Sequence, residues 1–379
     1  MRVRSDNPPP RHASFERVSA VLRKCMAASS IVALLGIAPA QGQLISTPSP
    51  QVTEFPLPNP AVAPCEIEFD RSGKAWIEEV VGNAISRFDP ATGVWARFPL
   101  RQPAATPGGI EIGPDNGIWF PELTTNQITR IDATTGEMQS YSIPLGRIVS
   151  GTVNVGAAVA TDMATGKDNA IWFSMSGSAA IGRIDLTTKQ IEVVSLPTPL
   201  STVSALTQII QPGPGNLLVI SLAAANKLLT IDVFTREIKE YVVPTLAALP
   251  QGVTTDRDGL IWFTESAGQK IGTLDITTGK ITEYNLLALR GPLPVSVSLG
   301  NPLPLPGPIR QGSDGKIYFA EGGFEGGNKI GRFDPVTKTL KEFVVPTPLA
   351  GICDINNSQD GAIWFGALTG NRIGRLSIN

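Results

Sequence analysis

The chain is poor in histidine and cysteine. His12 is the only histidine among 379 residues, and the three cysteines are Cys25, Cys65 and Cys353. Histidine is the usual general base near neutral pH and a common ligand of zinc. Beyond residue 12, composition therefore excludes Ser-His-Asp catalysis, Cys-His catalysis and histidine-bound zinc.

Charge and aromatic content are also low. Charged residues make up 17% and aromatic residues 6% of the chain, whereas hydrophobic residues make up 42%. That is enough apolar material for a folded core, and it is not the composition of a disordered protein. The 38 glycines and 32 prolines follow no collagen period, so they indicate many short strands joined by tight turns.

The first 40 residues differ from the rest and predict a secretory signal peptide. Six basic residues precede an apolar run from Cys25 to Pro39, and Ala38-Pro39-Ala40 matches an A-x-A cleavage site. The run is too short to span a bilayer comfortably. We expect a signal peptide at 1–40, a linker at 41–50 and a secreted, extracellular mature protein. An organelle transit peptide or a misassigned start codon is the alternative.

Cleavage after Ala40 would remove His12 and Cys25 and change the net charge. It would leave 25 basic and 31 acidic residues, a net charge of −6. This acidity argues against nucleic acid and against an anionic membrane as partners. We expect a monomer whose ligand is a small molecule, a glycan or a protein.

One stretch of sequence recurs seven times. Its clearest copy runs from Gly259 to Tyr284 and has the pattern strand, turn, strand, turn, strand, with Asp258-Gly259 suited to a hairpin turn. An aromatic anchor marks the second strand of the copies, with a valine in the fourth: Trp76, Trp119, Trp172, Val219, Trp262, Tyr318 and Trp364. Copies whose anchors are spaced by 43 to 56 residues predict an all-β, seven-bladed β-propeller with four-stranded antiparallel blades. The aromatic anchors are expected to pack between blades.

The last copy ends at Asn379, after its third strand. Residues 51–58, with the sequence QVTEFPLP, look like an outer strand that has no blade before it. The N-terminal strand is therefore expected to complete the last blade and close the ring, which removes the free sheet edges. Residues 51–379 would then form a single domain.

Carboxylates recur at equivalent positions of several copies. In a propeller, the strand ends at these positions should meet at one mouth of the central channel. Glu79, Glu122, Glu265 and Glu321 each lie three residues after an aromatic anchor, and Glu66 and Asp162 lie ten residues before one, as does Asp354. Crowded carboxylates raise one another's pKa or recruit a cation, and Mg²⁺ or Ca²⁺ prefers oxygen ligands. We expect a carboxylate rim, with Glu122, Glu265 and Glu321 as the metal ligands. The alternative is a solvated acidic rim without an ion.

Two cysteines remain after the predicted cleavage. Cys65 and Cys353 each lie eleven residues before an aromatic anchor, in the first and the last copy. Those copies become neighbours when the ring closes, so a disulfide between them is expected in a secreted protein. The alternative is two buried thiols.

The repeated line P-x-G-I, D-G-x-I-W-F-T-E, N-K-I-G-R-I-D-P resembles the virginiamycin B lyase (streptogramin lyase) family over residues 51–379. The best matches are Asp258 to Glu265, Asn328 to Pro335 and Asp360 to Phe365. The resemblance implies the propeller fold. It also implies an elimination that opens a cyclic depsipeptide ester, with Mg²⁺, carboxylates and histidines at the channel mouth.

This chain departs from the family at the histidines. Their expected place, eleven residues before each aromatic anchor, holds Cys65, Gly108, Thr161, Gln208, Gln251, Gly307 and Cys353. The family glutamate carries over at Glu265, and by position at Glu122 and Glu321. The resemblance therefore implies the metal half of such a site without the family's catalytic histidines.

Three hypotheses remain open, and the sequence leaves it uncertain whether the protein is an enzyme. The first is a secreted propeller that binds a ligand at a carboxylate-lined channel mouth. The second is a divalent-metal-dependent lyase, or a lactonase or esterase-like enzyme, that uses carboxylates instead of histidine. The third is a structural protein with no ligand at the channel.

Overall fold

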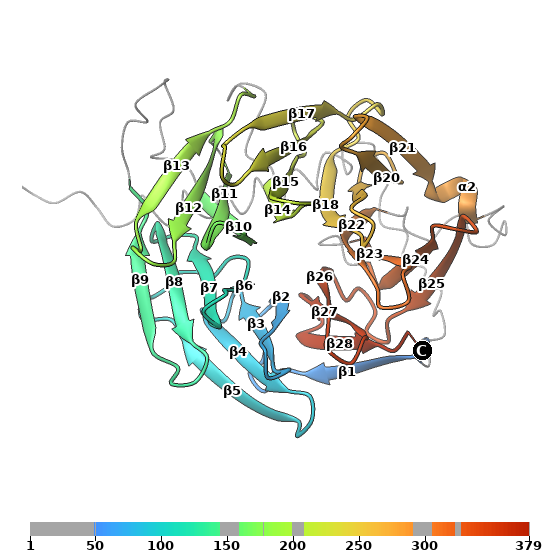
Figure 1. Cartoon of the computed structure of the whole chain (residues 1–379). Helices are drawn as coiled ribbons and strands as arrows, with labels where there is room; N and C mark the ends of the chain where they lie inside the picture. The colour runs from blue at the N-terminus through green and yellow to red at the C-terminus, as the bar shows by residue number, and fades with distance from the viewer. Residues whose placement is uncertain are drawn as a thin grey trace, which may run out of the picture.

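The computed structural model describes residue 49 and residues 51–144, 159–176, 178–198, 208–290, 305–322 and 327–378. The predicted signal peptide and almost all of the linker lie outside these ranges. The described strands form seven four-stranded antiparallel sheets arranged in a ring (Figure 1). The prediction of an all-β, seven-bladed propeller is therefore confirmed.

Each blade runs from an innermost strand to an outer strand (Figure 1). The innermost strands are β2 (Pro64–Phe69), β6 (Glu111–Ile112), β10 (Val159–Gly166), β14 (Gln208–Pro212), β18 (Pro250–Thr255), β22 (Pro306–Gln311) and β26 (Ile352–Asn357). The second strands are β3 (Ala75–Glu79), β7 (Gly117–Glu122), β11 (Ala170–Ser176), β15 (Leu217–Leu222), β19 (Ile261–Glu265), β23 (Ile317–Glu321) and β27 (Ile363–Ala367). The third strands are β4 (Ala84–Asp89), β8 (Gln127–Asp132), β12 (Ala180–Asp185), β16 (Lys227–Asp232), β20 (Lys270–Asp275), β24 (Lys329–Asp334) and β28 (Arg372–Leu376). The outer strands are β5 (Val94–Pro99), β9 (Met138–Ser142), β13 (Ile191–Ser195), β17 (Ile238–Val242), β21 (Lys280–Asn285), β25 (Thr339–Val344) and, for the last blade, β1 (Val52–Pro56).

Helix is almost absent from the described chain. The five-residue α2 (Leu286–Arg290) follows β21. Within the described ranges, no helix is long and apolar enough to cross a membrane.

The aromatic anchors hold neighbouring blades together. Trp76 of the first blade packs with Ile110 and Ile118 of the second, in a cluster that excludes water from the interface. The indole N–H of Trp76 also donates to Asp70 in the turn before its own strand, at 2.9 Å. Burying a tryptophan is favourable because the ring is large and its polar atom is bonded. The expected packing role of the anchors is confirmed.

The N-terminal strand closes the ring. β1 pairs antiparallel with β28, from Val52 opposite Leu376 to Pro56 opposite Arg372 (Figure 1). Its Glu54 accepts hydrogen bonds from the backbone and side chain of Thr347, at 3.3 and 2.8 Å. The predicted closure is confirmed, because β1 occupies the position that an outer strand occupies in every other blade.

A disulfide joins the first and last blades near the centre of the ring. It links Cys65 on β2 to Cys353 on β26, with Cα atoms 5.0 Å apart. That separation lies within the usual range for a bridge. Because the two cysteines are 288 residues apart, the bridge closes a loop of nearly the whole propeller.

Candidate functional site

On five innermost strands, an irregular register against the second strand changes the direction of side chains. β2, β10, β18, β22 and β26 each shift register against their second strand close to where they begin. Such bulges bend a strand and redirect one side chain. Glu66, Asp162 and Asp354 lie at or directly after these shifts, and their carboxylates interact electrostatically with one another.

Six acidic side chains gather at the inner ends of blades 1, 2, 3 and 7. We call them the central carboxylate cluster: Glu66, Glu68, Glu78, Glu111, Asp162 and Asp354. Arg310 reaches them from β22 in blade 6. One of its guanidinium nitrogens lies 3.8 Å from a carboxylate oxygen of Asp354. Among the described residues, this arginine is the cation that stabilises the ionised cluster, so negative charge outweighs positive charge here.

Three of these carboxylates bridge neighbouring blades. Glu66 accepts a hydrogen bond from the backbone N–H of Ile110 at 2.8 Å. Asp162 accepts one from Ile210 at 2.8 Å. Asp354 is within 3.5 Å of the Ile67 nitrogen. Each bond crosses to the next blade, so these side chains are held in fixed positions.

Gly109 allows two of the carboxylates to meet. A β-carbon at this position would lie 2.7 Å from both carboxylate oxygens of Glu66 and 3.0 Å from one oxygen of Asp162. Glu66 comes from blade 1 and Asp162 from blade 3, and both reach over Gly109 in blade 2. Any other residue at 109 would push the two carboxylates apart.

Glu78 is the most enclosed member of the cluster. Its side chain is 3% exposed, and its Oε2 atom has no hydrogen-bond partner. Three other blades carry a hydroxyl at this position, and in two of them Ser174 and Thr264 accept a backbone N–H at 3.0 and 2.9 Å. Glu78 accepts the corresponding N–H of Glu66. The glutamate thus adds a second, unbonded oxygen that a hydroxyl would not have.

Burial raises the pKa of every member of the cluster. It raises the pKa of Glu78 to about 8, and the pKa values of Glu111 and Asp162 to about 7. The pKa values of Glu66 and Glu68 lie well above the ordinary range, because neighbouring carboxylates repel in addition to burial. The pKa of Asp354 is also raised by burial, with Arg310 opposing the rise. The cluster therefore retains protons near neutral pH and can accept or donate them.

The raised pKa of Glu78 predicts that stability falls as pH rises. A carboxyl with a folded pKa of about 8 and an ordinary unfolded pKa binds more protons when folded. The free energy of unfolding should therefore decrease from about pH 5 to about pH 8. Glu78→Gln should raise it at pH 8 by about 1–3 kcal/mol and change it little at pH 5.

Urea unfolding of both proteins at pH 5 and pH 8 measures this effect. Glu137→Gln, at an exposed position of the turn before β9, is the matched control and should keep the wild-type pH dependence. Equal pH dependence in wild type and Glu78→Gln would contradict the assignment of Glu78.

The four glutamates at the ends of second strands do not join this cluster. Glu79 accepts hydrogen bonds from Ser86 on β4 and from Arg97 on β5, at 2.8 Å for the arginine. Glu122 accepts bonds from Thr125 and Thr129, both at 2.6 Å. Both glutamates are satisfied within their own blades.

Each of the other two glutamates lies beside an acidic residue of its own outer strand, and both carboxylate oxygens of Glu265 lack a hydrogen-bond partner. Glu265 lies beside Glu283 of β21, and burial together with that neighbour raises the pKa of Glu265 to about 7. Glu321 bonds Arg290 at the end of α2, and burial together with Glu342 raises the pKa of Glu321 to about 7. Alternation along each strand turns these carboxylates toward the third and outer strands of their own blades and away from the central carboxylate cluster, and a common rim formed by them stays a prediction.

The structure brings together only some of the residues predicted for the rim. Glu66 and Asp162 meet over Gly109, with Asp354 in the same cluster. Glu122, Glu265 and Glu321 lie in blades 2, 5 and 6. In the described part of the chain, no group of three or more acidic or cysteine side chains is placed to hold a metal ion. The residues as placed do not fit the Mg²⁺ that the family resemblance implies, and metal binding stays a prediction of the sequence.

Sequence reasoning missed Glu68, Glu78, Glu111 and Arg310. A positional signal could have found three of them, since Glu68, Glu111 and Arg310 each lie eight residues before an aromatic anchor. The signal for Glu78 is a charged residue directly after Trp76 and Ile77, on a strand whose residues are all buried.

Comparisons with known proteins agree with this architecture. The model of the Virginiamycin B lyase family matches residues 41–202 and 146–297. No curated protein matches the chain. A streptogramin B lyase structure is 28% identical with a TM-score of 0.72, covering 86% of this chain and 97% of that chain. A catalytically inactive histidine-to-alanine variant of virginiamycin B lyase from Staphylococcus aureus, with quinupristin, is 28% identical with a TM-score of 0.71, covering 86% and 99%.

More distant structures share the fold alone. An extracellular domain from B. thetaiotaomicron is 14% identical with a TM-score of 0.62, and covers 85% of this chain and 42% of its own. Hydrazine synthase from Kuenenia stuttgartiensis is 13% identical with a TM-score of 0.63, and covers 89% and 98%. Since the family match spans well over half of the sequence, and the blades repeat its pattern, the chain belongs to the virginiamycin B lyase family.

Proposed function

We propose that this protein is an exported propeller that binds a small molecule carrying a cationic group at the central carboxylate cluster. The observation that carries the proposal is the meeting of Glu66 and Asp162 over Gly109, beside the unbonded oxygen of Glu78. A ligand ammonium group would relieve the repulsion between these carboxylates and stabilise their ionised forms. Export is supported by the disulfide, since such bridges persist in oxidising compartments.

The streptogramin-opening reaction of relatives is not the favoured function. The inactive relative lacks a histidine by design, and from residue 13 onward this chain has no histidine at all. At one expected histidine position, Gln251 instead accepts a hydrogen bond from Ser266 at 2.8 Å. A glutamine side chain cannot serve as a general base near neutral pH.

A second candidate is a lyase, lactonase or esterase-like reaction in which carboxylates replace histidine. The pKa of Glu78 near 8, and of Asp162 near 7, would suit a general base or acid at neutral pH. In this candidate Glu78 would accept the proton that an elimination removes, or the proton of an attacking water. This proton transfer by Glu78 does not require a metal ion.

Equilibrium binding of a panel of primary and quaternary amines tests the first candidate. An amine that binds the cluster should raise the melting temperature of the mature protein, because it binds only the folded state. The double variant Glu66→Gln/Asp162→Asn should weaken binding at least about tenfold. The control Glu137→Gln should bind like wild type. If no amine binds at millimolar concentration, the proposal fails.

Turnover of esters and lactones tests the second candidate. The panel is run with Mg²⁺, with Ca²⁺ and with a chelator, so that any metal requirement is also measured. If the reaction uses Glu78, Glu78→Gln should lower kcat about a hundredfold or more while the protein remains folded. Turnover that Glu78→Gln leaves unchanged would remove this candidate.

A further inference from the structure

A recurring three-residue contact fills the same space in blades 4 and 5. In blade 5, Lys270 at the start of β20 lies 2.7 Å from Glu283 on β21, and Thr245 donates to the same carboxylate at 2.9 Å. Blade 4 repeats the arrangement with Lys227 and Glu240, 2.6 Å apart, and with Thr198. We call this the Lys–Glu–Thr clasp. It joins the third strand, the outer strand and the loop that enters the blade.

Blade 2 replaces all three members of the clasp. Gln127 begins β8 where Lys270 begins β20. Ser140 occupies the position of Glu283 on the outer strand. Ser140 pairs with Thr129, the third residue of β8, and Glu283 pairs with Gly272, the third residue of β20. Gln102 occupies the position of Thr245, because each lies two residues after an equivalent backbone hydrogen bond. In one blade Leu100 N–H donates to the Asn83 carbonyl, and in the other Val243 N–H donates to the Asn226 carbonyl. The ion pair is thus lost, and one side chain becomes much shorter.

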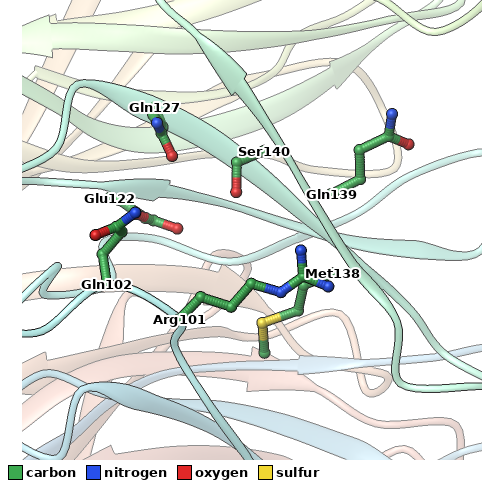
Figure 2. A pocket seen from close by; sticks show the side chains of 7 residues that line it. All are labelled: Arg101, Gln102, Glu122, Gln127, Met138, Gln139 and Ser140. Carbon is green, nitrogen blue, oxygen red and sulfur yellow. The ribbon is translucent and has the colours of Figure 1, made fainter.

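A cavity of about 390 Å³ lies where the clasp would be. Figure 2 shows Gln127 and Ser140 beside it, with Arg101 extending toward Met138. Gln102 completes its polar wall, whereas Gln139, between Met138 and Ser140 on β9, lines only the edge and directs its amide away (Figure 2). The cavity is within the size range of small-molecule sites.

Glu122 gives the cavity a fixed acceptor. Its side chain is 4% exposed, and its two oxygens accept bonds from Thr125 and Thr129. An ionised carboxylate has about four acceptor positions, so it can still accept further bonds. Because both oxygens are already bonded, the carboxylate is held in position before any ligand arrives.

We propose that this cavity binds a neutral carbohydrate unit. Two amides, a guanidinium, a hydroxyl and a carboxylate offer donors and acceptors close together, as adjacent sugar hydroxyls require. The single positive charge of Arg101 and the single negative charge of Glu122 give no net preference for a charged ligand. Met138 adds one apolar surface for the face of a sugar ring. A zwitterionic amino acid is the other occupant of this size, but the threonine bonds to Glu122 weaken its pull on an ammonium group.

Rebuilding the clasp tests the proposal without removing any core residue. The triple variant Gln102→Thr/Gln127→Lys/Ser140→Glu gives blade 2 the residues that blades 4 and 5 already accommodate. It should fill the cavity and keep the melting temperature at or above that of wild type. The probes are D-glucose, D-galactose, D-mannose, N-acetyl-D-glucosamine and glycine, measured by saturation-transfer NMR and calorimetry.

At least one sugar should bind the wild type saturably, and the triple variant should lose that binding. Gln102→Ala/Gln127→Ala should weaken it at least about tenfold. Glu78→Gln, in the central carboxylate cluster, should leave it unchanged, which separates this site from the proposed amine site. Binding of glycine but no sugar, no saturable binding, or equal sugar affinity in the triple variant would each overturn the proposal.

Discussion

Deletion of residues 41–58 is expected to abolish cooperative unfolding of the propeller. The deletion removes β1, which supplies the outer strand of the last blade. It also removes Phe55, whose ring lies 5.4 Å from that of Trp364 and 5.1 Å from that of Phe88. The loss therefore exposes the edge of β28 and opens an aromatic cluster between the last and first blades. Burial of several large side chains is comparable in free energy to the whole stability of a typical domain.

Urea unfolding followed by circular dichroism measures this result. A shorter deletion, of residues 41–48, is the control and should unfold like the mature protein, because β1 remains. The exposed β28 edge should also make the longer deletion prone to aggregation. A cooperative transition with an unchanged midpoint in the longer deletion would show that β1 does not close the ring.

Removal of the disulfide is expected to have the second-largest effect. Cys65→Ser/Cys353→Ser should lower the free energy of unfolding by about 4–5 kcal/mol on the loop-entropy model, and by about 2 kcal/mol at the low end of measured cases. The reason is that the bridge restrains almost the whole unfolded chain, with 288 residues between its cysteines. The effect should have the opposite sign to that of the single substitution Glu78→Gln at pH 8.

Thiol titration checks the bridge directly. The unfolded, unreduced mature protein should contain no free thiol, and reduction should release two. The control is wild type under reducing conditions, which should match the double serine variant in unfolding midpoint. Two free thiols before reduction would exclude the bridge.

The two closures act at opposite ends of the same blade. β1 pairs with β28 at the perimeter, whereas Cys65 and Cys353 join β2 to β26 near the centre (Figure 1). The perimeter closure buries apolar surface in the folded state, and the central one restricts the unfolded state. Their contributions to stability should therefore be nearly additive.

The central carboxylate cluster shows which features the repeat positions predict and which they do not. Equivalent positions in seven copies identify which side chains share a level in the ring, and this placed Glu66, Asp162 and Asp354 at one position. It did not say which way the side chains of Glu79 or Glu122 turn. Side-chain direction depends on alternation along each strand, and the register shifts at the start of the innermost strands break that alternation locally.

By itself, the sequence determined the blade number, the aromatic anchors, the pairing of β1 with the last blade and the matching positions of the two cysteines. These features repeat along the chain, and each repeat is one local unit of strands and turns. Only the tertiary structure decided that Glu66 and Asp162 meet over Gly109, that Arg310 crosses to them from blade 6, and that blade 2 has a cavity in place of a clasp. Those outcomes depend on contacts between different blades and on the space left by missing side chains, which no single repeat encodes.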